Sequence, residues 1–125
     1  MEEKLNTILA EVAHNIGGTI GISIVELESG MALATYSTQK EFNLDVAAAY
    51  NAEVVKQKMK AMTALNLKNQ TISEFIIVLT TQTHLINIVN PKYILYFAYD
   101  STVSNLAMAK AVLASASDKL KSILV

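Results

Sequence analysis

The feature that most constrains the fold of this chain is a hairpin pattern placed between a short helical segment and a long one. Residues 16–37 read IGGTIGISIVELESGMALATYS. Apolar and small or polar residues alternate on both sides of the turn, with the period of two expected of strands. The turn itself reads Glu-Ser-Gly, and Gly30 readily adopts positive φ. The segment therefore predicts two antiparallel strands.

Three helices are predicted around this hairpin. Apolar residues at three- and four-residue spacing indicate an amphipathic helix over residues 2–16, which Gly17 helps to terminate. Neither Pro nor Gly interrupts residues 44–65, a stretch that predicts one helix of about six turns. The Asp-Ser-Thr triplet at residues 100–102 provides capping groups for a last helix, whose predicted apolar face includes Val103.

Three further strands are predicted between the second and third helices, at residues 71–81, 83–90 and 93–100. Their breaks are short, as in antiparallel hairpins. The continuous apolar run at residues 76–79 indicates a strand covered on both faces, and such a sheet has helices on each side. The order helix, two strands, helix, three strands, helix predicts an α+β fold with one antiparallel sheet.

The long helix carries two apolar flanks. One comprises Leu44, Ala48, Ala52, Val55, Met59 and Met62, and the other comprises Ala47, Tyr50, Val54, Ala61 and Leu65. Together they form an arc of about 200°, whereas a helix lying on one sheet shows a stripe of about 100° or somewhat more. Either other elements of this chain cover both flanks, or a second subunit covers one. Small residues favour the second subunit, because they allow close approach of another helix.

We therefore expect a dimer. The predicted interface contains four residues of the long helix and one of the third strand: Ala48, Val55, Met59, Met62 and Ile77. Burial of four or five medium side chains would contribute on the order of 5 to 10 kcal/mol before association costs are deducted. Glu53 and Lys56 belong to the solvated side of the helix and are the predicted partner-binding residues.

The composition excludes several classes of function. A net charge of −1 and a pI near 6.1 leave no basic footprint for nucleic acid. All 10 basic residues are lysines, so the chain has no arginine to stabilise a phosphoryl transition state. It also contains no cysteine, which excludes disulfides and thiolate metal sites.

Length and hydropathy suggest one domain, residues 1–125, in the cytoplasm. The mean hydropathy of +0.34 is high for a small soluble protein, which agrees with an apolar surface that meets another subunit. A membrane span is the alternative explanation, but the apolar runs fall short of the roughly 20 residues it needs. The charged start of the chain is unlike a signal peptide.

The sequence shows no recognisable catalytic, cofactor or metal site. His14 and His84 lack carboxylates at ligand spacing. The Gly-Gly-Thr-Ile-Gly segment runs from helix to strand, opposite to a phosphate loop, and no serine occupies a Gly-x-Ser-x-Gly turn. Glu26 and Glu28 are more typical of solvated turn residues than of an acid/base pair. Three tyrosines, Tyr93, Tyr96 and Tyr99, alternate between the faces of one strand and are expected to pack the sheet. We expect no enzyme.

The element order, the Gly-Gly-Thr-Ile-Gly entry, the Glu-Ser-Gly turn and the Ala-rich second helix resemble the roadblock/dynein light chain family, in its prokaryotic type, over residues 3–124. The resemblance implies five antiparallel strands, with the long helix on one face and the terminal helices on the other. It also implies pairing through the long helix and third strand.

Prokaryotic members associate with small Ras-like GTPases in signalling, so the resemblance implies a non-enzymatic scaffold. Profilin-like or PAS-like ligand sensing, with a pocket lined by the tyrosines or by Met59 and Met62, is one alternative. A motor light-chain adaptor is another.

Overall fold

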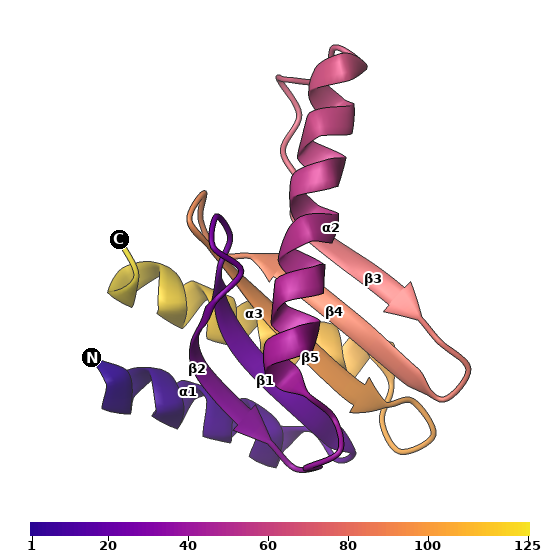
Figure 1. The fold of residues 1–125 in the computed structure, drawn as a ribbon. Helices are drawn as coiled ribbons and strands as arrows, with labels where there is room; N and C mark the ends of the chain where they lie inside the picture. The colour runs from indigo at the N-terminus through magenta and orange to yellow at the C-terminus, as the bar shows by residue number, and fades with distance from the viewer.

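The computed structural model describes all of residues 1–125 and contains three helices and five strands (Figure 1). In chain order they are α1 (Glu2–Asn15), β1 (Thr19–Glu26), β2 (Ala32–Ser37), α2 (Leu44–Ala64), β3 (Glu74–Val78), β4 (Gln82–Ile88), β5 (Tyr93–Asp100) and α3 (Leu106–Ile123). This is the order predicted from the sequence. Gly30 has φ +74°, as the predicted turn requires.

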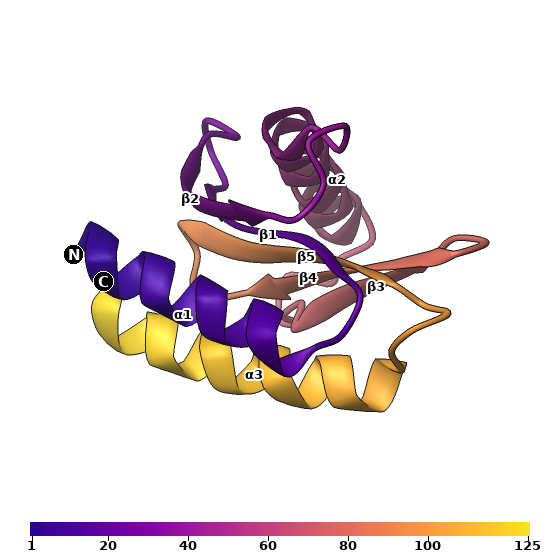
Figure 2. The ribbon, with the colours of Figure 1, turned by 90° about the horizontal axis from the view of Figure 1, so that it is seen from below.

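The five strands form one antiparallel sheet in the order β2-β1-β5-β4-β3. Helix α2 covers one face, and α1 and α3 lie side by side on the other (Figure 2). Strand β1 divides its side chains between two cores: Ile22 and Ile24 pack under α1 and α3, while Ile20 and Val25 pack under α2. Ile20 and Ile22 lie on opposite faces although they are two residues apart, because the pairing with β5 shifts register between Thr19 and Gly21. The predicted α+β architecture is confirmed.

The start of the last helix differs from the prediction. The Asp100 carboxylate accepts hydrogen bonds from the backbone N–H and the hydroxyl of Thr102, at 2.8 and 2.6 Å, and so forms a local turn. The helix is capped instead by Asn105, whose Oδ1 accepts from Met108 N at 2.9 Å. Val103 consequently lies outside the helix and is 61% exposed.

Strand β3 also differs from the prediction, because it is shorter than residues 71–81 and is not covered on both faces. It is an edge strand, paired only with β4. Val78 is 70% exposed, and Ile76 and Leu79 are also exposed. The apolar run is therefore partly solvated in the single chain. The one charged residue of β3 is Glu74 at its start, which pairs with Lys110 at 2.9 Å, so no charge interrupts the exposed apolar run itself.

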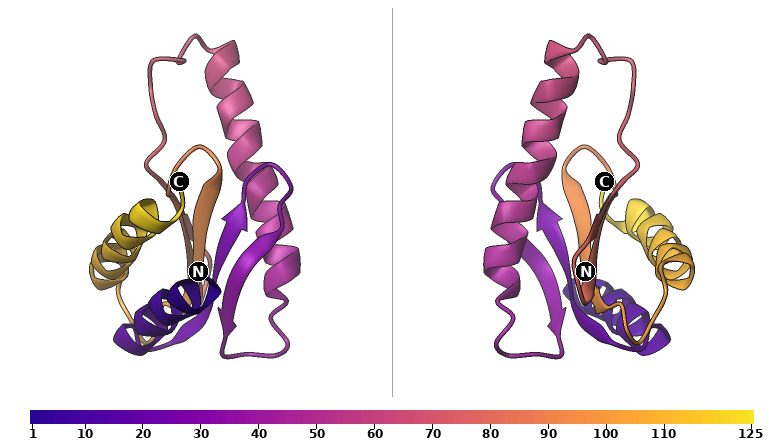
Figure 3. Two further views of the ribbon diagram at one scale, coloured as in Figure 1. Left: turned by 90° about the vertical axis from the view of Figure 1, so that its left-hand side faces the viewer. Right: turned by 90° about the vertical axis from the view of Figure 1, so that its right-hand side faces the viewer.

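Helix α2 projects beyond the end of the sheet, and residues 65–73 return from its tip to β3 (Figures 1 and 3). Asn66, with φ 60°, ends the helix in a Schellman motif. In this motif Leu67 N donates to Met62 O at 2.8 Å, and Asn66 N donates to Thr63 O at 3.2 Å. No helix combines the length and apolar character needed to cross a bilayer.

Candidate protein-interaction surface

One flank of α2 is fully used within the chain. Ala48, Ala52 and Val55 have no exposed surface and pack against the sheet. The prediction that this flank faces water in the single chain is therefore wrong at Ala48 and Val55. Their predicted place in a dimer interface rested on that exposure. The physical reason is that small side chains bring a helix as close to a sheet as to another helix. Met59 and Met62, farther along, are half-buried near the tip.

The second flank of α2 is left without a covering element. Tyr50 is 72% exposed, Val54 43% and Leu65 64%; with the half-buried Ala47 and Ala61 they form what we call the outer flank. At 100° per residue these side chains lie roughly opposite Lys56, whose Nζ donates to Glu28 O in the β1–β2 turn at 3.0 Å. The outer flank thus points away from that hairpin, toward the side of the sheet that carries β4 and β3.

The sheet beside the outer flank is open. Helix α2 packs against β1, β2 and β5, and β3 extends beyond the helix (Figure 2). Phe75 and Ile77 of β3 and His84 of β4 point to the α2 side and are half-buried. Of the five residues predicted for the interface, Ile77 is therefore the one that lies beside the outer flank. The flank and this strip of sheet form one candidate interaction surface.

An aromatic cluster supports this strip of sheet. The His84 ring makes T-shaped contacts with the rings of Phe42 and Tyr96, with centroid separations of 6.0 Å to Phe42 and 5.5 Å to Tyr96. The Tyr96 hydroxyl donates to His84 Nδ1 at 3.1 Å, and His84 Nε2 donates to Gln82 Oε1 at 2.9 Å. Burial lowers the pKa of His84 and raises the pKa of Tyr96, because it disfavours both charged forms. The cluster is neutral, which suits it to burial under a partner.

The free edge of β3 offers unpaired backbone groups. Leu79 N donates to Gln82 O at 2.8 Å, and Ile88 N donates to Ser73 O at 3.2 Å. Because hydrogen-bonded and non-hydrogen-bonded pairs alternate in an antiparallel ladder, Ile77 bonds inward to β4, whereas the N–H and C=O groups of Ile76 and Val78 point outward. An extended segment could add to this edge.

Of the predicted partner-binding residues, Lys56 lies roughly opposite the outer flank of α2, whereas Glu53 lies between Lys56 and Tyr50 around the helix. Glu53 Oε1 and Lys56 Nζ form an ion pair of 2.8 Å, and the hydrogen bond and charge of Lys56 lower the pKa of the Glu53 carboxyl. The Glu53 side chain is well exposed, whereas that of Lys56 is 30% exposed. Since Lys56 also holds the β1–β2 turn, it has a structural role that the sequence did not indicate.

The remaining polar residues form no catalytic constellation. His14 lies on α1 and His84 on β4, and no group of three His, Cys, Asp or Glu residues converges on a metal position. Glu26 accepts a hydrogen bond from the hydroxyl of Ser29 at 2.6 Å, a contact within the turn. Tyr96 faces α2, and Tyr99 packs in the opposite core, as the strand alternation predicts.

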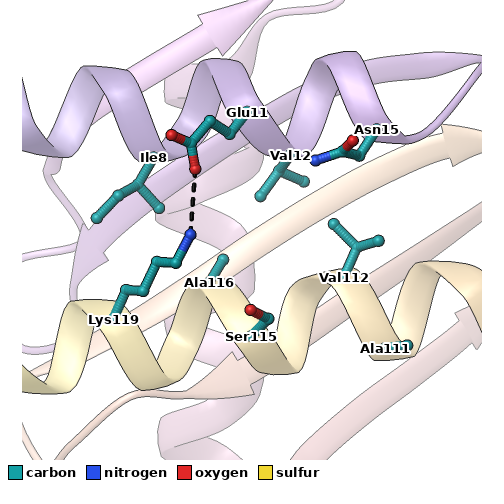
Figure 4. Close-up of a pocket in the computed structure, with 9 residues that line it drawn as sticks. All are labelled: Ile8, Glu11, Val12, Asn15, Ala111, Val112, Ser115, Ala116 and Lys119. Atoms are coloured by element: carbon teal, nitrogen blue, oxygen red, sulfur yellow. Dashed lines mark hydrogen bonds and ion pairs between the residues drawn. The ribbon is translucent and has the colours of Figure 1, made fainter.

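A shallow pocket of about 260 Å³ lies between α1 and α3 (Figure 4). Small side chains such as Ala111 and Ser115 border it, and Glu11 Oε2 pairs with Lys119 Nζ across it at 3.2 Å. Glu11 and Lys119 are the two charged residues that line the pocket, and this ion pair neutralises both. The pocket marks the seam where the two terminal helices pack.

The chain has the fold of roadblock/LC7 proteins. No model of a protein family matches the sequence, and no curated protein does. A structure of Myxococcus xanthus MglB aligns with a TM-score of 0.86 at 14% identity, covering 97% of this chain and 87% of the other. A structure described as MglB with tetrameric arrangement aligns with a TM-score of 0.85 at 18% identity, covering 98% of this chain and 88% of the other. A roadblock/LC7 domain from Streptomyces avermitilis aligns with a TM-score of 0.83 at 9% identity, covering 95% of this chain and 96% of the other.

Sequence reasoning identified both flanks of α2 but predicted exposure for the one that the sheet covers. Polar Asn51 and Lys58 lie between the two flanks, so they do not indicate which flank is buried.

Proposed function

We propose that this chain, as one domain over residues 1–125, is a homodimeric, non-enzymatic scaffold that binds a small Ras-like GTPase in cytoplasmic signalling. The observation that carries the proposal is the exposed apolar outer flank of α2 beside the free edge of β3. Resemblance to roadblock proteins supports it, as does the description of one similar structure as tetrameric. Pairing of two outer flanks, and of two β3 edges, would cover both features at once.

In this proposal the GTPase binds the surface of the paired α2 helices, where Glu53 is exposed. The chain contains no arginine, so it has no arginine finger to insert, and any stimulation of hydrolysis would reposition groups of the GTPase itself. Preference for one nucleotide state is expected, because the γ-phosphate orders the switch loops that a regulator contacts.

Binding of purified GTPases from the same organism, loaded with GDP or a GTP analogue, tests the proposal. Glu53→Lys should weaken retention of the preferred state by about tenfold through charge reversal at the contact, while sedimentation shows an unchanged dimer. Asp118→Lys, an identical charge change on α3, is the matched control. Lys56→Ala is a poorer probe, since it also releases the β1–β2 turn. Failure of every GTPase to bind in both states, or direct GTP binding to this chain by calorimetry, would contradict the proposal.

A second candidate function, small-molecule sensing, is favoured by one observation. Met59 and Met62 line a pocket of about 460 Å³ near the tip of α2, within the range of about 300–1,000 Å³ typical of ligand sites. The two functions are compatible, because the pocket lies on the sheet side of α2 and not on its outer flank.

A further inference from the structure

The pocket beneath the tip of α2 is formed by four segments. The last turns of α2 form one wall, the returning segment 65–73 forms another, and the β4–β5 turn closes the sheet end, while α3 contributes Lys121. Figures 1 and 3 show these segments around the projecting end of the helix. The Schellman motif at Asn66 holds the second wall in place, because it fixes Leu67 relative to Met62.

The lining of this pocket combines the apolar side chains of Met59, Met62, Leu67 and Ile88 with the polar side chains of Thr63, Gln70, Thr71 and Asn90. Methionine is flexible and polarisable, so two methionines on one wall can adapt to a chain of variable shape. The volume of about 460 Å³ lies in the lower half of the range of ligand sites. This volume suits one alkyl chain and is too small for a lipid with two acyl chains.

The charged residues that line this pocket are all positive. Among its lining residues the charged ones are Lys68 and Lys121, and no carboxylate lines it. Lys68 forms no ion pair, and Lys121 lies 3.6 Å from the well-exposed carboxylate of Asp118. In a chain of net charge −1, two lysines beside the apolar side chains of Met59 and Met62 complement an anionic head group attached to an apolar tail.

We propose that this pocket binds a free single-chain carboxylate of the fatty-acid class. The alkyl chain lies against Met59 and Met62, and the carboxylate lies between the ammonium groups of Lys68 and Lys121. Lysine suits this role as a point charge that needs no bidentate geometry. The ligand would bridge the tip of α2 to the sheet, so its presence would stabilise the projecting turns of the helix.

The five methionines provide the test. With methyl-¹³C methionine, Met59 and Met62 report on the pocket, whereas Met1, Met31 and Met108 are exposed elsewhere. Decanoate, titrated below its aggregation threshold, should shift the Met59 and Met62 signals saturably and leave the other three unchanged. Neutral 1-decanol should bind about tenfold more weakly, and decylammonium more weakly still.

Variants separate the contributions of charge and apolar contact. Lys68→Gln and Lys121→Gln should each weaken decanoate binding about threefold to tenfold, whereas Lys40→Gln, in the loop before α2, should not. Met62→Glu should abolish binding, because it places a carboxylate in the pocket. The proposal is overturned if no methyl signal shifts, if all five shift alike, or if decylammonium binds as well as decanoate. A response to anionic phospholipid vesicles but not to free decanoate would also overturn it.

Discussion

At the scale of single residues, close packing of α2 on the sheet depends on a glycine in β1 and on small side chains in α2. Gly21 of β1 lies directly beneath Leu44, the first residue of α2, and a Cβ atom there would approach Leu44 Cδ2 to 2.7 Å. Ala48 and Ala52 continue this contact with no exposed surface. The role of Gly21 in close packing was predictable from its place in a strand. The identity of the residue that packs on Gly21 was not predictable, because Leu44 is distant from it in sequence.

Gly21→Ala should destabilise the fold by about 1–3 kcal/mol, because the added methyl group overpacks the contact with Leu44. Urea unfolding measures the effect. Gly17→Ala is the matched control, since its Cβ would lie 3.4 Å from Val103 Cγ1, an ordinary contact, and should change stability by less than about 0.5 kcal/mol. Leu44→Ala should make Gly21→Ala less costly. Equal effects of the two glycine substitutions would contradict this account.

His84 should make stability dependent on pH. Burial lowers its pKa in the folded state below the usual value of about 6.5, so the unfolded chain binds more protons in the interval between the two pKa values. Stability contributed by neutral His84 is therefore present above pH 6.5 and is lost as pH falls through that interval. His84→Gln should remove this part of the slope while still accepting a hydrogen bond from Tyr96.

The measurement for His84 is the urea midpoint as a function of pH between 7.5 and 5, which spans the ordinary histidine pKa of about 6.5. His14→Gln, an exposed change on α1, is the control and should keep the wild-type slope. An unchanged slope in His84→Gln would show that other groups produce the dependence.

At the scale of elements, local sequence patterns located every helix and strand, and their errors have physical causes. Asp100 and Asn105 both accept hydrogen bonds from backbone N–H groups, but only Asn105 starts a helix. A capping side chain therefore cannot be told from a turn residue by type alone. The choice between the flanks of α2 was open for a different reason. Periodicity reports that a flank is apolar, and tertiary placement decides what covers it.

Strand β3 provides a prediction that separates folding from association. Ile77→Pro removes an N–H that bonds inward to β4, so it should lower the melting temperature and also dissociate the dimer. Ile76→Pro removes an outward N–H and should weaken dimerisation with a smaller loss of monomer stability. Thermal unfolding and sedimentation together distinguish the two. If Ile76→Pro leaves the dimer intact, the edge of β3 is not paired between subunits.

At the scale of the whole molecule, the two faces of the sheet are unequally covered. Helices α1 and α3 together close one face, while α2 alone lies on the other and leaves β3 exposed (Figure 2). The pocket at the tip of α2 results from the same asymmetry, because the helix is longer than the sheet it covers. The sequence left a pocket lined by Met59 and Met62 open as an alternative, but it did not show how far one element extends past another, and both features depend on that.

We expect the protein to be a dimer in solution. Wild-type protein at micromolar concentration should sediment with about twice its mass of 13.6 kDa, because burial of the outer flank removes apolar surface from water. Tyr50→Glu or Val54→Glu should raise the dissociation constant about 100-fold or more, since two-fold symmetry places two unpaired carboxylates in one interface. Met31→Glu, at a methionine that is 70% exposed in the β1–β2 hairpin, is the matched control and should remain dimeric. A wild-type monomer throughout this range, or dissociation by Met31→Glu alone, would assign the outer flank a role other than self-association.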